Sequence, residues 1–207
     1  MERNKINIAV LVSGGGTNLQ ALIDAQNSVI LSGEIKLCIS NNPSAYALKR
    51  AEKAGIKTVC IEKSGFENNR DMEAEMIRVL DREQIDLIVL AGFMSILSDG
   101  FTRRYEKRII NIHPSLIPSF CGKGYYGLRV HRAALEKGVK VTGATVHFVN
   151  EIPDGGEIIM QKAVNVLDRD TPESLQKRVM RLAEWKILPK AVEIVSAKLL
   201  EKERQSK

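Results

Sequence analysis

Short apolar runs alternate with longer amphipathic segments along the first half of the chain. The apolar runs lack the alternation of a half-buried strand, which is typical of strands buried on both faces of a parallel sheet. The predicted strands are Ile6–Val12, Ile35–Ser40, Thr58–Ile61 and Ile85–Leu90. Helical spacing predicts helices over 19–23, 45–54 and 67–82 between them. This rhythm predicts a doubly wound, mostly parallel α/β sheet.

The middle of the chain departs from that rhythm. A short helix at 99–105 leads into a β-branched strand that begins at Arg108, and another helix is expected over 130–137. Segment 141–149 alternates apolar and polar residues as a half-buried strand does, and strand 158–164 follows it without an intervening helix. Two adjacent strands without a crossover helix predict an antiparallel edge strand.

The C-terminal part predicts one long helix. Thr171, Pro172 and Glu173 supply a cap, a proline at the first helical position and an acid in the first turn. Pro189 is expected to kink or break this helix, because proline removes a backbone donor. We expect a single domain over 1–207, with a frayed tail from about residue 201.

The composition is typical of a soluble globular protein. Of the 207 residues, 44% are hydrophobic and 27% are charged, and no apolar run reaches the length that spans a bilayer. The N-terminus runs directly into a strand pattern and lacks the apolar region of a signal peptide. The three cysteines are far apart and form no CxxC motif. We therefore expect a cytoplasmic protein without membrane partner or metal site.

The net charge of +6 raises the question of anionic partners. Basic residues are scattered through the helices, apart from the tail at 198–207, and aromatic residues make up only 5% of the chain. A nucleic-acid surface that stacks bases needs more aromatic side chains than this. The charge therefore favours a solvated basic surface that attracts an anionic small molecule.

The first candidate site is the glycine loop Ser13-Gly14-Gly15-Gly16-Thr17-Asn18, between a strand and a helix. This order aims free backbone N–H groups at an anion, and Thr17 or Asn18 is expected to cap the helix. No lysine follows as in a Walker loop, and no third glycine stands where a dinucleotide fold needs one. A single phosphate suits the loop best, with a tight turn that binds nothing as the alternative.

The second candidate site is Asn111-Ile112-His113-Pro114, at the end of a buried strand. Asn111 and His113 are two residues apart, so an extended backbone directs both side chains to the same side. Open α/β sheets bind ligands at the carboxyl ends of their strands. One side chain is able to hold an oxygen atom while the other handles a proton, although a histidine after a strand is as often a hydrogen-bonded corner residue.

Three further features are weighed with these sites. The apolar loop Ala91–Ser98 follows a central strand and either packs under other residues or lines a pocket for a flat ligand. Asp154 precedes Gly155-Gly156 and by itself favours a turn. His131 is expected to be a packing or surface residue, and His147 a core residue or a support for the site.

Taken together, four motifs give the chain a specific resemblance. They are Ser13–Gln20, Ala91-Gly92-Phe93-Met94, Asn111–Pro118, and Val146–Val149 followed by Asp154-Gly155-Gly156. In this order they resemble the phosphoribosylglycinamide formyltransferase family, over about the whole chain. The resemblance implies a Rossmann-like formyltransferase fold. It implies formyl transfer from 10-formyltetrahydrofolate, a co-substrate, to the amine of glycinamide ribonucleotide, with a monomer or homodimer and no metal.

The resemblance also carries site residues onto this chain. The catalytic trio falls on Asn111, His113 and Asp154, and the residues that bind the substrate phosphate fall on Ser13, Gly14, Gly15, Gly16, Thr17 and Asn18. A glutamate that contacts the glycinamide end falls on Glu184, by its place five residues before Pro189. The folate pocket falls on Met94, Ser95, Ile96 and Leu97, with Asn111 and the backbone near Asp154. Ser95 stands where many relatives carry Arg, and Cys121 where Pro is common.

These residues suit acyl transfer without a covalent nucleophile. Such a reaction needs a donor for the oxyanion, a proton carrier and a group that orients them. We expect Asn111 to serve the oxyanion and Asp154 to raise the pKa of His113 or to bind an ordered water.

Two alternatives stay within formyl-folate proteins. Methionyl-tRNA formyltransferases share the Asn-x-His core but carry a C-terminal RNA-binding domain, and formyltetrahydrofolate hydrolases carry an N-terminal regulatory domain. Neither extra domain is expected here. A nucleotide- or RNA-binding module is the alternative of another class and rests only on the net charge.

Overall fold

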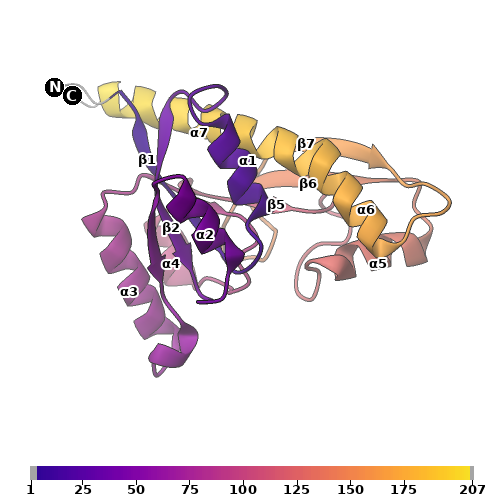
Figure 1. The fold of residues 1–207 in the computed structure, drawn as a ribbon, viewed down its shortest axis with the longest axis horizontal. Coiled ribbons are helices and arrows are strands. Elements are labelled where there is room, and N and C mark those ends of the chain that lie inside the picture. The colour runs from indigo at the N-terminus through magenta and orange to yellow at the C-terminus, as the bar shows by residue number, and fades with distance from the viewer. Residues whose placement is uncertain (1–3, 206–207) are drawn as a thin grey trace.

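Seven strands form one twisted sheet in the computed structural model, which describes residues 4–205 (Figure 1). Their order is β3-β2-β1-β4-β5-β6-β7. The strands are β1 (Ile6–Val12), β2 (Gly33–Ser40), β3 (Lys57–Cys60), β4 (Leu87–Leu90), β5 (Ile109–His113), β6 (Val141–Phe148) and β7 (Ile158–Asn165). Strands β1 to β5 pair in parallel, while β6 runs antiparallel to β5 and β7 antiparallel to β6. The predicted mostly parallel sheet with an antiparallel edge strand is confirmed.

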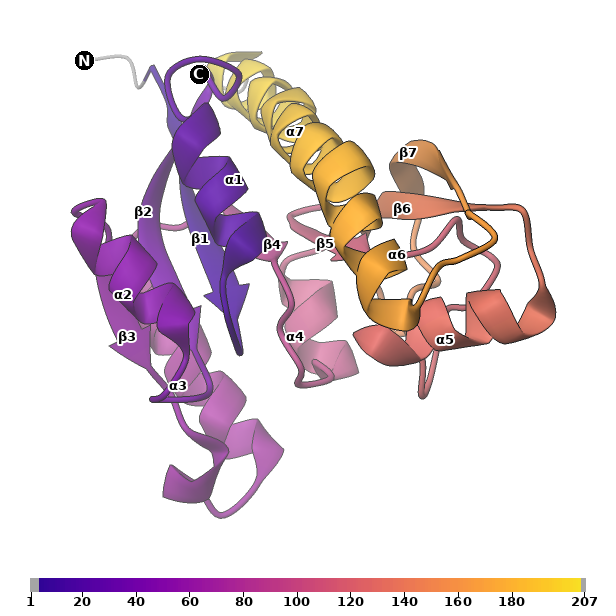
Figure 2. The same ribbon diagram turned by 45° about the vertical axis from the view of Figure 1, so that its right-hand side comes forward.

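Helices cover both faces of this sheet (Figures 1 and 2). They are α1 (Thr17–Ala25), α2 (Tyr46–Lys53), α3 (Asn69–Arg82), α4 (Asp99–Arg104), α5 (Leu128–Lys137), α6 (Pro172–Val179) and α7 (Trp185–Gln205), with a 3₁₀ turn, η1, at Lys63–Gly65. Buried residues of α1, α2, α6 and α7 pack on one face, and those of α3 and α4 on the other. Within residues 4–205, no helix has the length and apolar character that a bilayer crossing requires.

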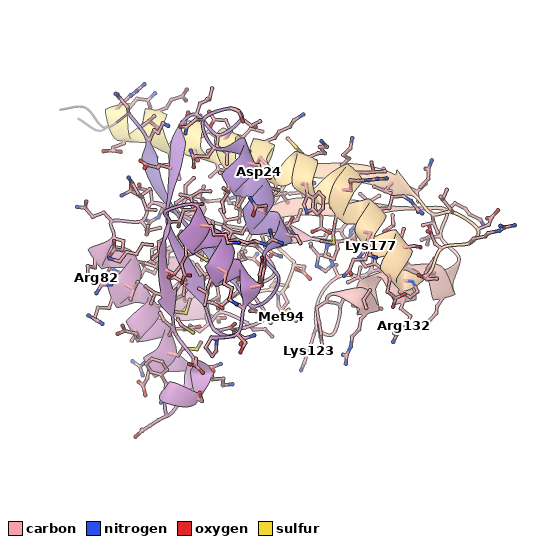
Figure 3. The ribbon with its side chains drawn as sticks, in the orientation of Figure 1. Asp24, Arg82, Met94, Lys123, Arg132 and Lys177 are labelled. Carbon is pink, nitrogen blue, oxygen red and sulfur yellow. The ribbon has the colours of Figure 1, made fainter. Side chains whose placement is uncertain are left out.

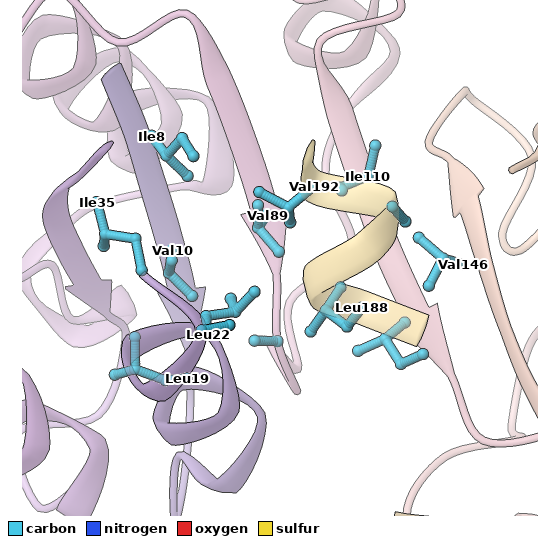
Figure 4. Packing of buried hydrophobic residues seen from close by; sticks show 14 of the residues in the cluster. Ile8, Val10, Leu19, Leu22, Ile35, Val89, Ile110, Val146, Leu188 and Val192 are labelled. Atoms are coloured by element: carbon cyan, nitrogen blue, oxygen red, sulfur yellow. The ribbon is translucent and has the colours of Figure 1, made fainter. Parts of the chain in front are cut away.

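Strand β1 explains why its sequence is apolar at nearly every position. Ile8 and Val10 face the layer of α1 and α7 (Figure 4). Ala9 and Leu11 face the layer of α3. All four side chains are fully buried. A strand with helices on both faces has no solvent-facing side on which polar residues would be favoured.

Strand β6 was predicted to be half-buried, and this is wrong. It lies between β5 and β7, and six of its eight residues are buried, including Thr142, Thr145 and His147. The polar side chains are tolerated because they are hydrogen-bonded: the Thr145 hydroxyl donates to the carbonyl of Ser115 at 2.7 Å. The alternation marks an interior strand with polar partners, not an exposed face.

The C-terminal helix differs from its prediction in two ways. Thr171 caps α6 as expected, but the irregularity lies before Pro189: residues Met180–Glu184 form a π-helical turn, η2, and α7 continues through the proline. The helix also extends to Gln205, so the tail is helical where fraying was expected from about residue 201. Residues 206–207 lie outside the described part of the chain.

Candidate active site

The candidate site lies at the carboxyl ends of β1, β4 and β5. At β1 the chain order of the sheet reverses, with β2 on one side and β4 on the other. Ligands of open α/β sheets bind at such a switch point. The glycine loop follows β1, the apolar loop Ala91–Ser98 follows β4, and Asn111 and His113 end β5, so the sheet brings the sequence-predicted segments to one edge.

Asp154 stands at the centre of the polar cluster. Its Oδ2 atom lies 3.5 Å from Nδ1 of His113, and its Oδ1 atom lies 3.5 Å from both Nε2 of His147 and Nδ2 of Asn111. The backbone N–H of Gly122 donates to Oδ2 at 2.8 Å. The carboxylate therefore contacts β5, β6 and the loop that contains Gly122 at once, which no local turn requires.

The backbone around Asp154 fixes this position. Asp154 adopts φ 57°, in the left-handed region that aspartate tolerates better than most residues. Two residues later, a Cβ atom at Gly156 would lie 1.7 Å from the carbonyl oxygen of Phe148 on β6. Glycine is therefore required there for the loop to approach the strand. Asp154 is thus both a turn residue and a member of the polar cluster.

Burial dominates the electrostatics of this cluster. It lowers the pKa of His113, and the Asp154 carboxylate and the Phe120 carbonyl, which favour the charged imidazole, offset it only in part. Burial also opposes ionisation of Asp154, but His147, the charge of His113 and the Gly122 N–H together keep the pKa of that carboxyl below its ordinary value. Asp154 raises the pKa of His113 as predicted, but burial outweighs this effect and the net shift is downward.

Both ring nitrogens of His113 face acceptors. Nε2 lies 2.9 Å from the Phe120 carbonyl oxygen, so Nε2 carries a proton, and Nδ1 faces Asp154. A proton that arrives on Nδ1 would be stabilised at once by the carboxylate. Burial lowers the pKa of His113, which favours the uncharged ring, and the free Nδ1 of that form suits the acceptance of a proton.

Asn111 is oriented by His147. The His147 Nδ1 atom lies 2.8 Å from the carbonyl oxygen of Phe148, and its Nε2 atom lies 3.2 Å from Nδ2 of Asn111. Nδ2 of Asn111 also lies 3.5 Å from Oδ1 of Asp154. This contact is long, so the amide is able to exchange it for a better acceptor. His147, which the sequence left as a core or supporting residue, is this support.

The glycine loop has a different cap from the predicted one. The N-cap of α1 is Gly16, at φ 70°, and neither Thr17 nor Asn18 caps the helix through its side chain. A Cβ atom at Gly16 would lie 2.6 Å from the Cβ of Ala47, so α2 packs directly against the loop. The first N–H groups of α1 have no partner within the helix, because no helical turn precedes them to offer its carbonyl oxygens. Free N–H groups at the start of a helix are able to bind an anion through backbone atoms alone.

Asn18 contacts Glu184 instead. Its Nδ2 donates to Oε2 of Glu184 at 2.6 Å, and Glu184 lies at the end of the π-helical turn. Burial raises the pKa of Glu184 to about 7, and the Asn18 N–H opposes that shift. The structure therefore brings Glu184, which the resemblance named as a substrate contact, next to the glycine loop.

Two cavities open onto this edge of the sheet. The first, about 350 Å³, we call the glycine-loop cavity; its walls include Gly14–Asn18, Gly92, Met94, Gly127, His131, Met180 and Glu184. The second, about 140 Å³, we call the loop cavity; its walls include Phe93, Ser95, Ile96, Leu97, Asn111, His147 and 149–154. A groove of about 480 Å³ between α1 and α7 contains none of the polar cluster.

The apolar loop is divided between these cavities. Ser95, Ile96 and Leu97 line the loop cavity, whereas Met94 lines the glycine-loop cavity. Met94, labelled in Figure 3, is held there because its backbone N–H donates to the Ser13 hydroxyl at 2.8 Å. Ser95 accepts from the Asn41 side chain at 2.8 Å. The sequence grouped these four residues, and the hydrogen bond to Ser13 separates Met94 from the rest.

Several cavity residues were not named individually among the predicted site residues. Phe93 and residues 149–153 line the loop cavity, and Gln176, Met180 and His131 line the glycine-loop cavity. They come from elements remote in sequence, and their own segments carry ordinary helix or loop patterns. Phe93 lies inside the apolar loop after β4, and residues 149–153 lie near Asp154, where the resemblance placed backbone of the folate pocket. Gln176, Met180 and His131 had no such signal.

Comparison with known proteins relates the chain to formyl transferases. The formyl transferase family model matches residues 6–192. The phosphoribosylglycinamide formyltransferase of Escherichia coli strain K12 is 42% identical over 174 residues, 84% of this chain and 80% of that protein. The trifunctional purine biosynthetic protein adenosine-3 of Homo sapiens is 45% identical over 95% of this chain, which spans 19% of that relative. The glycinamide ribonucleotide transformylase 1 of Symbiobacterium toebii has a TM-score of 0.88 at 38% identity, covering 94% of this chain and 89% of that structure.

Proposed function

The chain belongs to the formyl transferase family, and on that basis we propose that it transfers a formyl group from 10-formyltetrahydrofolate to the amine of 5-phosphoribosylglycinamide in purine biosynthesis. The observation that carries this proposal is the position of Asp154 between Asn111, His113 and His147. Asn111 provides an amide donor, His113 a proton acceptor and Asp154 a partly buried carboxylate, and these groups together suit acyl transfer.

The two cavities suit the two substrates. The backbone N–H groups at the start of α1 suit a single phosphate at the edge of the glycine-loop cavity. The apolar walls of the loop cavity, with Ile96 and Leu97, suit a flat pteridine ring. Asn111 and Asp154 line the loop cavity, so a folate bound there would carry its formyl group beside the polar cluster.

The reaction follows from the cluster without a covalent enzyme intermediate. The neutral amine attacks the formyl carbon, and the C=O bond opens to an oxyanion that the Asn111 amide stabilises by donating a hydrogen bond. The ammonium formed on the nucleophile loses a proton to His113 Nδ1, where Asp154 stabilises the resulting charge. His113, or a water held by Asp154, returns that proton to N10 of the folate as the C–N bond breaks. The products are the formamide and tetrahydrofolate.

A direct assay tests this function. Purified protein with glycinamide ribonucleotide and 10-formyltetrahydrofolate, without ATP, is expected to yield formylglycinamide ribonucleotide and tetrahydrofolate in equal amounts. Thermal shifts complete the test, because a ligand that binds the folded state raises the melting temperature. A shift with tRNA but not with the ribonucleotide, together with no turnover, would contradict the proposal and favour a tRNA-directed member of the family. We also propose that the protein works in the cytoplasm on small molecules alone.

A further inference from the structure

His131 is an anomaly of the buried interior. The side chain is fully buried on α5, yet neither Nδ1 nor Nε2 has a hydrogen-bond partner among the described residues. Buried polar atoms in proteins are nearly always hydrogen-bonded, because an unsatisfied one forfeits its hydration without compensation. A leucine would fill the same space without that cost. The fold therefore gives no reason for an imidazole at this position.

The position of His131 points to a ligand. His131 lines the glycine-loop cavity, as do Asn18 and Glu184. Asn18 repeats the anomaly: its Nδ2 is bound to Glu184, but its buried Oδ1 has no partner within residues 4–205. Five buried side-chain atoms in that range lack partners, and three of them belong to these two residues on one cavity. Such clustering indicates polar atoms reserved for a bound molecule.

We propose that His131 hydrogen-bonds a ribose hydroxyl of the ribonucleotide substrate, with Asn18 Oδ1 accepting from the neighbouring hydroxyl. This inference rests on the proposed function, which puts a phosphate at the start of α1 and an amine at the polar cluster. Asn18 belongs to the glycine loop, so its side chain is beside the part of the substrate that follows the phosphate, which is the ribose. A hydroxyl both donates and accepts, and it therefore suits an amide oxygen and an imidazole equally.

The imidazole is uncharged in this role. Burial, and to a lesser extent the charge of His113, lowers the pKa of His131 to about 4. At neutral pH the ring therefore offers one N–H donor and one acceptor, which match a neutral hydroxyl.

Access to the ring passes over Gly127. Gly127 caps α5 and lies four residues before His131, on the same side of the helix, and helical side chains lean toward the N-terminus. Gly127 also lines the cavity, and a Cβ atom there would meet nothing within 4 Å. The ring nitrogens lie beneath the cavity surface, so binding requires a small shift of this first turn, and the space beside Gly127 permits it.

The experiment compares His131→Leu with the wild type in binding and stability. Calorimetry with glycinamide ribonucleotide is expected to show about tenfold weaker binding by His131→Leu, which is the worth of one hydrogen bond. The melting temperature without ligand is expected to stay the same or rise, because the unsatisfied nitrogens are gone. His131→Gln retains a donor and an acceptor, so most of the affinity should return. Arg132→Leu, an exposed neighbour on α5 (Figure 3), serves as the control without effect.

Analogues that lack the 2- or 3-hydroxyl of the ribose identify the contact. The wild type is expected to bind at least one of them about tenfold more weakly than the full ribonucleotide, and His131→Leu to lose that discrimination. An active wild type whose affinity His131→Leu leaves unchanged would overturn the inference alone. A parallel loss of stability and of affinity for every analogue would show a structural role and also overturn it. A wild type that neither binds the ribonucleotide nor transfers the formyl group would overturn the proposed function and this inference together.

Discussion

The amide of Asn18 donates to the carboxylate of Glu184 at 2.6 Å, across 166 positions of sequence. The contact joins the first turn of α1 to the π-helical turn before α7. A π-helical turn inserts one extra residue into a helix and often marks a functional site. Here it ends at Glu184, whose carboxylate is buried against the glycine loop. The contact holds the titratable carboxylate of Glu184 in the wall of the glycine-loop cavity.

Glu184 is expected to make stability depend on pH. Burial raises its pKa from 4.5 to about 7 on folding, so the folded state holds this proton more tightly than the unfolded chain. The contribution of Glu184 to the free energy of unfolding therefore falls as the pH rises from about 4.5 to about 7, by roughly 3 kcal/mol at most, and is constant above that. In thermal melts from pH 5 to 8, Glu184→Gln should lose this pH dependence and be more stable than the wild type at pH 8. Equal slopes for both proteins would contradict the raised pKa.

Asp154 and His113 are expected to act as one unit. Asp154→Asn keeps the shape but removes the charge that stabilises a proton on His113, so single-turnover formyl transfer should slow by about 10²–10⁴ with little change in substrate affinity. His113→Ala should be similarly slow, and the double variant much less than multiplicatively worse. Glu157→Gln, an exposed carboxylate three residues away, is the control. Additive barrier changes would instead mean that the two residues act independently.

Substitutions at Gly15 and at Gly16 are expected to impair different properties, substrate binding at Gly15 and stability at Gly16. A Cβ atom at Gly15 meets nothing within 4 Å, so Gly15→Val should fold normally but obstruct the phosphate. The KM for the ribonucleotide should rise about ten- to a hundredfold, while the KM for the folate stays near normal. In Gly16→Ala the new Cβ atom meets Ala47 and the left-handed backbone is strained. The free energy of unfolding should therefore fall by about 1–3 kcal/mol, which a lower melting temperature would show. A Gly15→Val variant that weakens both substrates equally would argue against a phosphate site.

Ile96 is expected to bind the folate. The side chain is 67% exposed while lining the loop cavity, so Ile96→Asp should not disturb the core. Binding of a folate analogue should weaken by about tenfold or more, because a charge replaces apolar contact area, while ribonucleotide binding stays near normal. Leu167→Asp, at an apolar side chain that is 54% exposed outside both cavities, controls for the added charge. Unchanged analogue binding in folded Ile96→Asp would exclude this cavity.

Local patterns predicted most of the elements. Apolar runs found β1, β2 and β4, because a strand buried on both faces has no polar alternation. Thr171 and Pro172 marked the start of α6 through chemistry confined to four residues. The pattern wrongly predicted a half-buried β6, because its polar side chains are buried with partners such as the Ser115 carbonyl that they meet only after folding. The π-helical turn at Met180–Glu184 also left no local mark, since its residues are ordinary helix formers.

By itself, the sequence determined the order of strands and helices, the loops at the ends of β1, β4 and β5, and the residue types available there. These follow from spacing along the chain, which period and caps record. Only the tertiary structure decided that Asp154 meets Asn111 and His147, and that Met94 belongs to a different cavity from Ile96. The tertiary structure further decided that His131 is buried with no hydrogen-bond partner among residues 4–205. It also decided the net pKa shift of His113, where burial outweighs the carboxylate. The reason is that contacts, burial and their electrostatic balance depend on atoms far apart in sequence, whose distances exist only once the sheet and its loops have packed.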